Sequence, residues 1–389
     1  MDHATQVRLT RALLGHIAAG STSLADQVTR NPTSVYTDRA VLELEREMLF
    51  RGYPLLIGFS CQVPQAGDYL TDDFSGVPIV VLRDRDGRIR AFINVCRHRG
   101  ARLVRGCGRV GKHLVCPYHG WSYGLDGRLA GVPQRHSFAD LELEEHGLGA
   151  LPVVEKAGMI WVRPRPGESF DIDAHLHGLG PELESYDCAG YHFYESRVIE
   201  REMNWKMVID TFLEPYHFAY LHRDTVGPIF MPNLCLFHAF GLNLRETLPR
   251  RSIVELRERP EAEWNLIPHT AIVYVLFPNT VFIMQADHIE TWRVYPKDNR
   301  TDRCVMYLDF LIPEAAENES ARRHWQRNMD LAIATVDQED FPTGEGIQRG
   351  FASGAQAHLT YGRNEPALAH FENAVKIALA ATGGQSAGV

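Results

Sequence analysis

Two pairs of cysteine and histidine residues carry the most distinctive chemistry in the sequence. Cys96 and His98 are separated by one residue, and Cys116 and His119 are separated by two residues. Thiolate and imidazole groups are common ligands of protein-bound metals. Two loops that each offer one sulfur and one nitrogen can therefore clasp a single metal centre from both sides.

The order of these four ligands distinguishes two kinds of metal site. Structural zinc sites usually present two cysteines close together and then two histidines. Here the ligands alternate in the order Cys96, His98, Cys116 and His119. A Rieske [2Fe–2S] cluster has two cysteines on one iron and two histidines on the other. We therefore predict that these four residues bind a Rieske cluster, with a structural zinc site as the alternative.

A second candidate metal site lies further along the chain. His217 and His222 stand at the end of segment 205–221, whose sequence predicts a helix. A regular α-helix would rotate His222 away from His217 by about 140°. Both histidines can bind one metal if the helix ends or widens there, through a π-bulge or the disturbance that Pro215 introduces. The alternative is two ordinary polar residues at a helix end.

Carboxylates accompany these histidines. On the predicted helix, Asp210, Glu214 and His217 share one face at spacings of i, i+4 and i+7. Two histidines and one carboxylate form the facial triad of non-haem Fe(II) oxygenases, which leaves positions open for O2 and substrate. A third ligand is expected from a later acidic segment, which offers Asp337, Glu339, Asp340 and Glu345.

The two sites fall in segments with different patterns. Residues 54–165 contain short strands, and Asp86-Gly87 and Asp126-Gly127 are typical hairpin turns, so we predict a small all-β domain there. A segment rich in proline and glycine at 163–167 marks its end. Strands and helices then occur in separate runs, which predicts an α+β domain with an antiparallel sheet over 166–389.

Helical spacing of apolar residues predicts the helices that frame these domains. We expect residues 1–53 to form N-terminal helices that pack on the α+β domain. The predicted helices cover 7–19, 38–51, 319–338 and 366–381.

The composition restricts the partners and the location. The net charge of −9 argues against nucleic acid as the main partner. No apolar run is long enough to cross a bilayer, and the N-terminal residues lack the pattern of a signal peptide. We therefore predict a cytoplasmic protein without a membrane partner. The seven cysteines are odd in number and widely spaced, so a disulfide framework is not expected.

One stretch contrasts with this acidic chain. Residues 87–125 contain no Asp or Glu but eight basic residues: Arg88, Arg90, Arg97, Arg99, Arg102, Arg105, Arg109 and Lys112. Such a patch suits docking of an acidic partner. The alternative is that several of these side chains pair with carboxylates elsewhere in the chain.

The two cysteine–histidine segments resemble a known family. Cys96-Arg97-His98-Arg99-Gly100 and Cys116-Pro117-Tyr118-His119-Gly120-Trp121 are similar to the two cluster loops of the Rieske non-haem iron oxygenases, the ring-hydroxylating family, in the alpha subunit of the terminal oxygenase. The resemblance implies a Rieske cluster, a mononuclear Fe(II) and a helix-grip-like catalytic domain. It also implies a homotrimer and a separate NAD(P)H-dependent reductase or ferredoxin. The chain contains no dinucleotide-binding fingerprint, which agrees with a separate reductase.

The resemblance also implies roles for the residues of the second site. Asp340, followed by Glu345 and Gln348, resembles the family's ligand segment and becomes the predicted third iron ligand beside His217 and His222. Glu214 occupies the place of a carboxylate that links this iron to the Rieske domain of a neighbouring subunit. We expect Glu214 and Asp210 to take part in catalysis. Glutamate at position 214 is similar to the oxygenases that act on carnitine and other quaternary ammonium compounds.

These observations predict an enzyme, a mono- or dioxygenase that uses O2 and reductase-supplied electrons to hydroxylate a small organic substrate. An aromatic ring compound is the first expectation. Oxidative N-demethylation or C–N cleavage of a quaternary ammonium compound or amine is the alternative. Five aromatic residues could line the substrate pocket or simply fill the core: Tyr274, Phe277, Phe282, Trp292 and Tyr295.

Two further alternatives lack oxygenase activity. A Rieske electron carrier without catalysis would need only the β domain, and a zinc-stabilised binding protein would need neither iron centre. The carrier reading leaves everything after Gly167 unexplained.

Overall fold

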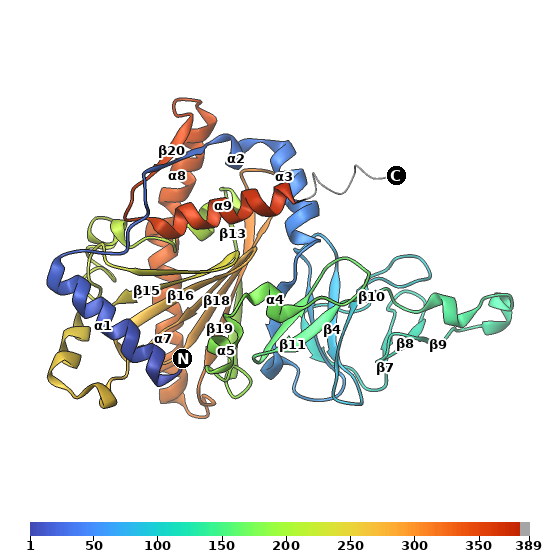
Figure 1. Ribbon diagram of the computed structural model, residues 1–389. Helices are drawn as coiled ribbons and strands as arrows, with labels where there is room; N and C mark the ends of the chain where they lie inside the picture. The colour runs from blue at the N-terminus through green and yellow to red at the C-terminus, as the bar shows by residue number, and fades with distance from the viewer. Residues whose placement is uncertain (382–389) are drawn as a thin grey trace. The chain divides into compact units, whose positions relative to one another are not determined.

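The computed structural model describes residues 1–381, so the last eight residues of the predicted domain 166–389 lie outside the described residues (Figure 1). The chain divides into two compact units, which we describe separately. The larger unit contains residues 1–45, 176–186 and 191–381, and the β unit contains 46–175 and 187–190.

The β unit is built from short antiparallel strands in three sheets. The five-stranded sheet has the order β10 (Ala150–Leu151), β5 (Ile89–Ile93), β4 (Ile79–Arg83), β3 (Asp68–Asp72) and β6 (Cys107–Arg109). The second sheet has the order β11 (Val153–Lys156), β12 (Met159–Val162) and β2 (Leu55–Phe59). The third has the order β7 (His113–Val115), β8 (Ser122–Gly124) and β9 (Leu129–Gly131).

Both predicted hairpin turns are present in the β unit. Asp86-Gly87 connects β4 to β5, and Asp126-Gly127 connects β8 to β9. Gly87 and Gly127 have φ values of 78° and 84°, a region that glycine adopts without the steric cost of a Cβ atom. These turns set the pairing of the strands that carry the cysteine–histidine loops.

The larger unit contains a seven-stranded antiparallel sheet, visible with its long strands in Figure 1. Its spatial order is β13 (His192–Arg201), β19 (Cys304–Ile312), β18 (Ile289–Pro296), β17 (Thr280–Met284), β16 (Thr270–Leu276), β15 (Asn243–Pro249) and β14 (Leu236–Phe240). A separate two-stranded sheet pairs β1 (Thr29–Pro32) with β20 (His358–Tyr361). The predicted α+β fold with a small all-β domain and an antiparallel sheet is confirmed.

The described helices are α1 (His3–Ala19), α2 (Ser34–Thr37), α3 (Arg39–Glu45), α4 (Ile172–Leu176), α5 (Gly180–Glu184), α6 (Trp205–Asp210), α7 (Glu319–Thr335), α8 (Phe341–Ala352) and α9 (Pro366–Ala380). Helix α6 packs on β18, and α9 packs on β14 and β15. Among residues 1–381, no helix combines the length and the apolar character needed to cross a membrane.

The helix predicted over 205–221 is wrong in its length. Helix α6 starts where the Asn204 side chain accepts a hydrogen bond from the backbone N–H of Lys206, and it ends at Asp210. Beyond it the chain tightens into i to i+3 turns and a 3₁₀ helix at Tyr216–Ala219. Pro215, which has no N–H to donate, lies at the break. The helix therefore ends well before the histidines rather than beside them.

The predicted helix 319–338 also differs at its end. Helix α7 stops at Thr335, a π-helical turn covers Val336–Asp340, and α8 then continues the helical path. Pro342 lies in the first turn of α8, where its missing N–H costs little. Gly344 lets α8 approach Met203, because a Cβ atom there would lie 2.7 Å from the Met203 sulfur.

Candidate iron centres and substrate pocket

The two cysteine–histidine loops of the β unit have the same backbone design. Cys96 follows β5 and Cys116 follows β7. In each loop the cysteine carbonyl accepts a hydrogen bond from the glycine four residues later, Gly100 at 3.0 Å and Gly120 at 3.0 Å. Both glycines have positive φ, 78° and 72°. The two tight turns therefore present their cysteine and histidine side chains in equivalent ways.

The side chains of these loops separate by chemistry. Both cysteines are 2% exposed and belong to the core of the β unit, whereas His119 is exposed and His98 is half-buried. The Nδ1 atoms of the two histidines face each other at 3.1 Å, and the His98 ring stacks on Trp121 with centroids 4.8 Å apart. Two buried sulfurs and two solvent-facing nitrogens are the donor set of a Rieske cluster.

Tyr123 also contacts this donor set. Its hydroxyl lies 3.3 Å from the Cys96 sulfur and accepts a hydrogen bond from the Arg97 backbone N–H at 2.9 Å. Because that oxygen already accepts from Arg97, its own proton can point to the sulfur. A hydrogen bond to a cluster-binding sulfur is one of the ways in which proteins tune the reduction potential.

In the larger unit, His217, His222 and Asp340 converge. The two Nε2 atoms are 3.1 Å apart, and one Asp340 carboxylate oxygen lies 3.4 Å from His217 Nε2 and 3.3 Å from His222 Nε2. His222 and Asp340 are buried, and the three form the group of possible metal ligands found among the described residues. Two imidazole nitrogens and a carboxylate aimed at one point fit a mononuclear Fe(II) site.

Different local structures bring these three residues together. His217 lies in the 3₁₀ helix Tyr216–Ala219, and His222 follows in a turn. Asp340 ends the π-helical turn Val336–Asp340 between α7 and α8. Of the two arrangements that the sequence allowed near His222, a π-bulge or a break at Pro215, the structure has the break. A π turn is present at the third ligand position, where such turns often mark functional sites.

A carboxylate fixes the orientation of each histidine. Glu214 bonds the Nδ1 of His217 and accepts from its backbone N–H at 3.0 Å. Glu339 bonds the Nδ1 of His222 at 2.6 Å. Both Nε2 atoms are thereby left to face the metal position. Glu214 thus lies beside His217, and its role in catalysis stays a prediction. Glu339 was considered only as a ligand candidate.

The charges explain the ionisation of this group. Burial disfavours protonation of His217, but the carboxylates of Asp340 and Glu214 outweigh it and raise its pKa to about 9. Burial alone would raise the pKa of Asp340, yet its hydrogen bonds with the two histidines lower it. A divalent cation in this position would replace the proton as the partner of the carboxylates.

The remaining acidic residues are engaged elsewhere. Asp337 pairs with Arg201, and Glu345 accepts a hydrogen bond from the backbone N–H of Glu202 at 3.2 Å. Asp340 is thus the candidate acid that the structure brings to the two histidines. Its assignment as an iron ligand remains a proposal that rests on this geometry.

Asp210 lies in a different network from the one expected. The Tyr36 hydroxyl is 2.7 Å from the Asp210 carboxyl and 2.7 Å from that of Glu372. One hydroxyl proton cannot serve both, so one of the two carboxyls should carry a proton of its own. Burial raises the pKa of both acids in agreement with this. Asp210 therefore does not share a helical face with Glu214 and His217, and its catalytic role stays a prediction.

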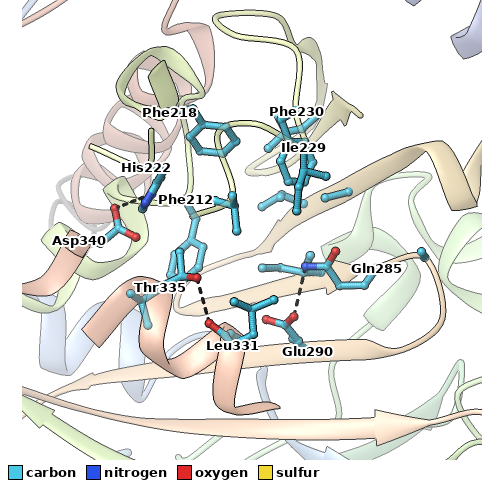
Figure 2. Close-up of a pocket in the computed structure, with 18 of the residues that line it drawn as sticks. Phe212, Phe218, His222, Ile229, Phe230, Gln285, Glu290, Leu331, Thr335 and Asp340 are labelled. Atoms are coloured by element: carbon cyan, nitrogen blue, oxygen red, sulfur yellow. Dashed lines mark hydrogen bonds and ion pairs between the residues drawn. The ribbon is translucent and has the colours of Figure 1, made fainter. Parts of the chain in front are cut away.

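A pocket of about 340 Å³ is lined by His217, His222 and Asp340. Figure 2 shows the last two at one side of it. Phe218 packs against both histidines, with ring centroids 5.0 Å from His217 and 5.4 Å from His222. Phe212 packs against Trp292 at 5.5 Å on the same wall. The end of the pocket near His217, His222 and Asp340 is therefore aromatic.

The opposite end of the pocket is polar. Figure 2 shows His222 and Asp340 on one side of the pocket and Gln285 and Glu290 on the other. The Gln285 amide donates to Glu290 at 3.2 Å and accepts from Arg250 at 2.9 Å. The pocket thus changes from aromatic to charged along its length.

Of the five aromatic residues that could line the pocket or fill the core, four fill the core. Trp292 lines the pocket, but Tyr274, Phe277, Phe282 and Tyr295 do not. These four are fully buried, and Tyr274 bonds Tyr186 and Glu182. They fill the core around the sheet, because alternate side chains of a strand point to opposite faces. The pocket's other phenylalanines, Phe212, Phe218 and Phe230, come from segment 211–230 and were not predicted from the sequence to line it.

The basic stretch 87–125 is partly neutralised within the β unit. Arg90 pairs with Asp84, Arg102 with Asp73 and Arg109 with Asp68. All three acids lie outside the stretch, so the alternative interpretation holds for these arginines. For the other five basic residues no ion pair is found within the described part of the chain.

Two family models match the chain. The Rieske [2Fe–2S] domain matches residues 54–149, and the ring-hydroxylating alpha subunit (catalytic domain) matches residues 188–381. The chain therefore belongs to the Rieske non-haem iron oxygenases, among the alpha subunits of terminal oxygenases. Its cofactors are the Rieske [2Fe–2S] cluster and the mononuclear iron of that family, as predicted.

Individual relatives are consistent with this family. The oxygenase subunit of glycine betaine monooxygenase from Chromohalobacter salexigens is 35% identical over 57% of this chain and 50% of that protein. The alpha subunit of biphenyl 2,3-dioxygenase from Rhodococcus jostii is 29% identical over 75% of this chain and 63% of that protein. The chain thus spans about half the length of the first of these relatives.

A solved structure shares the fold. The quaternary ammonium Rieske monooxygenase CntA has a TM-score of 0.78 at 22% identity, covering 90% of this chain and 95% of the CntA chain. At this identity the similarity concerns the fold alone.

A Glu339→Gln variant should bind the mononuclear iron about 10- to 100-fold more weakly, because the His222 ring loses the carboxylate that orients it. Titration of the iron-depleted chain with Fe(II), with the cluster intact, measures the affinity. Asp337→Asn is the matched control, since Asp337 lies in the same turn but pairs with Arg201. Unchanged affinity in Glu339→Gln would exclude the orienting role.

The ion pair of His288 should make stability depend on pH. Burial disfavours its protonation, but Asp287 and Glu290, at 2.7 and 3.1 Å, raise its pKa to about 9 from 6.5. The stabilisation is complete below pH 6.5 and is lost as the pH rises through 9. We expect His288→Gln to cost about 2 to 3 kcal/mol at low pH and much less above pH 9.

Urea unfolding of the wild type and His288→Gln at several pH values from 6 to 10 tests this expectation. His358→Gln, which changes an exposed histidine of the same unit, should leave the pH profile unaltered. A cost that stays constant across the range would show that His288 is not charged in the folded protein.

Proposed function

We propose that this chain is the catalytic component of a multicomponent oxygenase that hydroxylates a quaternary ammonium compound at a carbon next to the nitrogen. Hydroxylation there leads to demethylation or C–N cleavage, because a carbon that bears both nitrogen and a hydroxyl group releases the amine. One observation carries the proposal: His217, His222 and Asp340 converge at the aromatic end of a pocket whose other end is charged.

The aromatic end suits a positively charged nitrogen. A quaternary ammonium cannot donate a hydrogen bond, so aromatic faces attract it through their quadrupoles instead. Phe212, Phe218 and Trp292 supply such faces within the pocket that holds the iron ligands. A substrate held there has its N-bound carbons beside the site of reaction.

The polar end argues against an aromatic hydrocarbon. A ring system that filled the pocket would lie against Arg250, Gln285 and Glu290 and would strip water from them without replacing its hydrogen bonds. The similarity to glycine betaine monooxygenase supports the ammonium substrate. The similarity to biphenyl dioxygenase keeps aromatic hydroxylation as the second candidate.

The residues of the proposed sites have different roles. His217, His222 and Asp340 would hold the iron, while Glu214 and Glu339 keep the two imidazole rings in place. Cys96, His98, Cys116 and His119 would hold the cluster. When bound, the two centres supply electron storage and O2 activation. The aromatic wall binds the substrate and limits the access of water to the reacting carbon.

The proposal includes partners that a single chain does not contain. An NAD(P)H-dependent reductase or ferredoxin would deliver electrons, for which the five unpaired basic residues of stretch 87–125 offer a docking surface. A homotrimer would bring Glu214 of one subunit towards the cluster domain of the next. The cytoplasmic location stays a prediction.

A substrate screen tests the proposed function. The chain with both cofactors, a purified reductase and NADH should consume O2 with a quaternary ammonium compound and release an equivalent amount of aldehyde or demethylated amine. Turnover of biphenyl or naphthalene, with no turnover of any quaternary ammonium compound, would favour the second candidate. An iron content of about two per chain, with no turnover of any substrate, would favour an electron carrier without catalysis.

A further inference from the structure

The polar end of the pocket contains a guanidinium group without an acidic partner. Arg250 follows β15 and lines the pocket. Its Nη2 donates to the Gln285 side-chain oxygen at 2.9 Å, and its Nε lies 3.4 Å from the Thr270 carbonyl. Within the described residues no carboxylate lies within 4.0 Å of it. One edge of the guanidinium therefore keeps donors available for another group.

The nearby acids make their direct contacts with a different residue. Asp287 and Glu290 contact the two ring nitrogens of His288 at 2.7 and 3.1 Å. His324 contacts Asp287 from the other side at 3.3 Å. Glu290 also accepts from Gln285. These acids therefore act on Arg250 only at longer range and do not occupy its hydrogen-bond donors.

Arg250 remains charged in this partly buried place. Burial lowers the pKa of Arg250, and the nearby Asp287 and Glu290 counteract the effect. A guanidinium stays protonated in proteins even when it is partly buried. Its remaining N–H donors need acceptor atoms, which water or a bound ligand can supply.

Aromatic contacts define where Arg250 lies relative to the iron ligands. Phe218 contacts both histidines, and its ring centroid lies 5.5 Å from that of Phe230. The Arg250 guanidinium carbon lies 5.3 Å from the Phe230 ring centroid. The path along the pocket therefore runs from the iron ligands past two phenylalanines to the guanidinium.

We infer that Arg250 binds the carboxylate of the substrate, so that the enzyme prefers zwitterionic carboxylated ammonium compounds to ammonium alcohols. This inference rests on the proposed function and adds the chemistry of the substrate's far end. The ammonium lies among the aromatic rings near the iron ligands, and the carboxylate lies at the guanidinium, which can donate two parallel hydrogen bonds.

Glycine betaine and choline form a matched pair of probes. Both carry a trimethylammonium group on a two-carbon chain. Glycine betaine ends in a carboxylate, whereas choline ends in an alcohol. γ-Butyrobetaine carries its carboxylate further from the nitrogen, so it tests a longer distance between the ammonium and carboxylate sites. Binding is measured by isothermal titration calorimetry on the chain with both cofactors and without reductant, so that no turnover occurs.

The wild type should bind at least one carboxylated probe about 10- to 100-fold more tightly than choline, as a charge-assisted hydrogen-bonded pair provides. Arg250→Gln should abolish the preference while changing choline affinity by less than about threefold. Arg250→Lys keeps the positive charge but cannot donate two parallel hydrogen bonds, so it should retain part of the preference. It also replaces Arg250→Gln as the test variant if that variant folds poorly.

Arg251→Gln is the matched control, because the adjacent arginine is exposed and donates to the Pro228 carbonyl outside the pocket lining. It should bind all probes like the wild type. Equal or tighter binding of choline by the wild type, or a preference that survives in Arg250→Gln, would overturn the inference and leave the proposed function intact. Failure of every ammonium probe to bind, together with turnover of an aromatic compound, would instead reject the proposed function.

Discussion

A Cys116→Ala variant is expected to lose its acid-labile sulfide and its visible cluster absorption and to fall from about three irons per chain to about one. The Cys116 thiol is buried at the turn that follows β7, where solvent cannot substitute for it as a ligand. NADH-driven turnover should disappear, because electrons no longer reach the second site. Iron and sulfide analysis of the purified chain measures the outcome.

Cys107→Ala is the matched control for this variant. Cys107 lies on β6 of the same β unit, and its side chain is exposed. It should keep the full iron and sulfide content. Retention of the cluster spectrum in Cys116→Ala would refute the assignment of the two loops, and zinc without sulfide in the wild type would favour the structural zinc site.

A His217→Ala variant is expected to show the opposite pattern. It should retain the sulfide, the visible spectrum and about two irons per chain, while oxygenation falls by about a thousandfold or more. The substitution removes one of three ligands and leaves Glu214 without its imidazole partner. Elemental analysis, absorption spectra and coupled O2 consumption separate this loss from damage to the cluster.

His358→Ala controls for the loss of any histidine from this unit, since His358 lies exposed on β20. Its iron content and turnover should match those of the wild type. Turnover by His217→Ala at the wild-type rate would mean that the oxygen-activating site lies elsewhere. Together, the Cys116→Ala and His217→Ala variants assign about two irons to the cysteine–histidine loops and about one iron to the site at His217.

Local spacing was sufficient for the cluster loops. Each loop is a short turn that follows a strand, and its glycine, Gly100 or Gly120, permits the positive φ that closes it. Such turns are determined by residues close in sequence. The hairpins at Asp86-Gly87 and Asp126-Gly127 were predictable for the same reason.

The sequence predicted which residues of the second site would lie together, but not the local structure that brings them together. The spacing of Glu214, His217 and His222 indicated a metal site, yet the expected helix gives way to 3₁₀ turns. Helical periodicity over 205–221 is a weak preference that tertiary packing overrides. Asp340 was selected by resemblance, and its distance from the two histidines in sequence made a geometric argument impossible.

By itself, then, the sequence determined that a small all-β domain precedes an α+β domain. It also predicted the four cluster residues and the two histidines of the iron site, because each pattern depends on neighbours along the chain. Only the tertiary structure decided that Glu339 orients His222 across 117 residues and that the predicted aromatic stripe fills the core. It likewise decided that Arg250 faces the pocket. These features depend on which distant segments pack together. The pocket, for example, forms where the sheet, α7 and segment 211–230 meet.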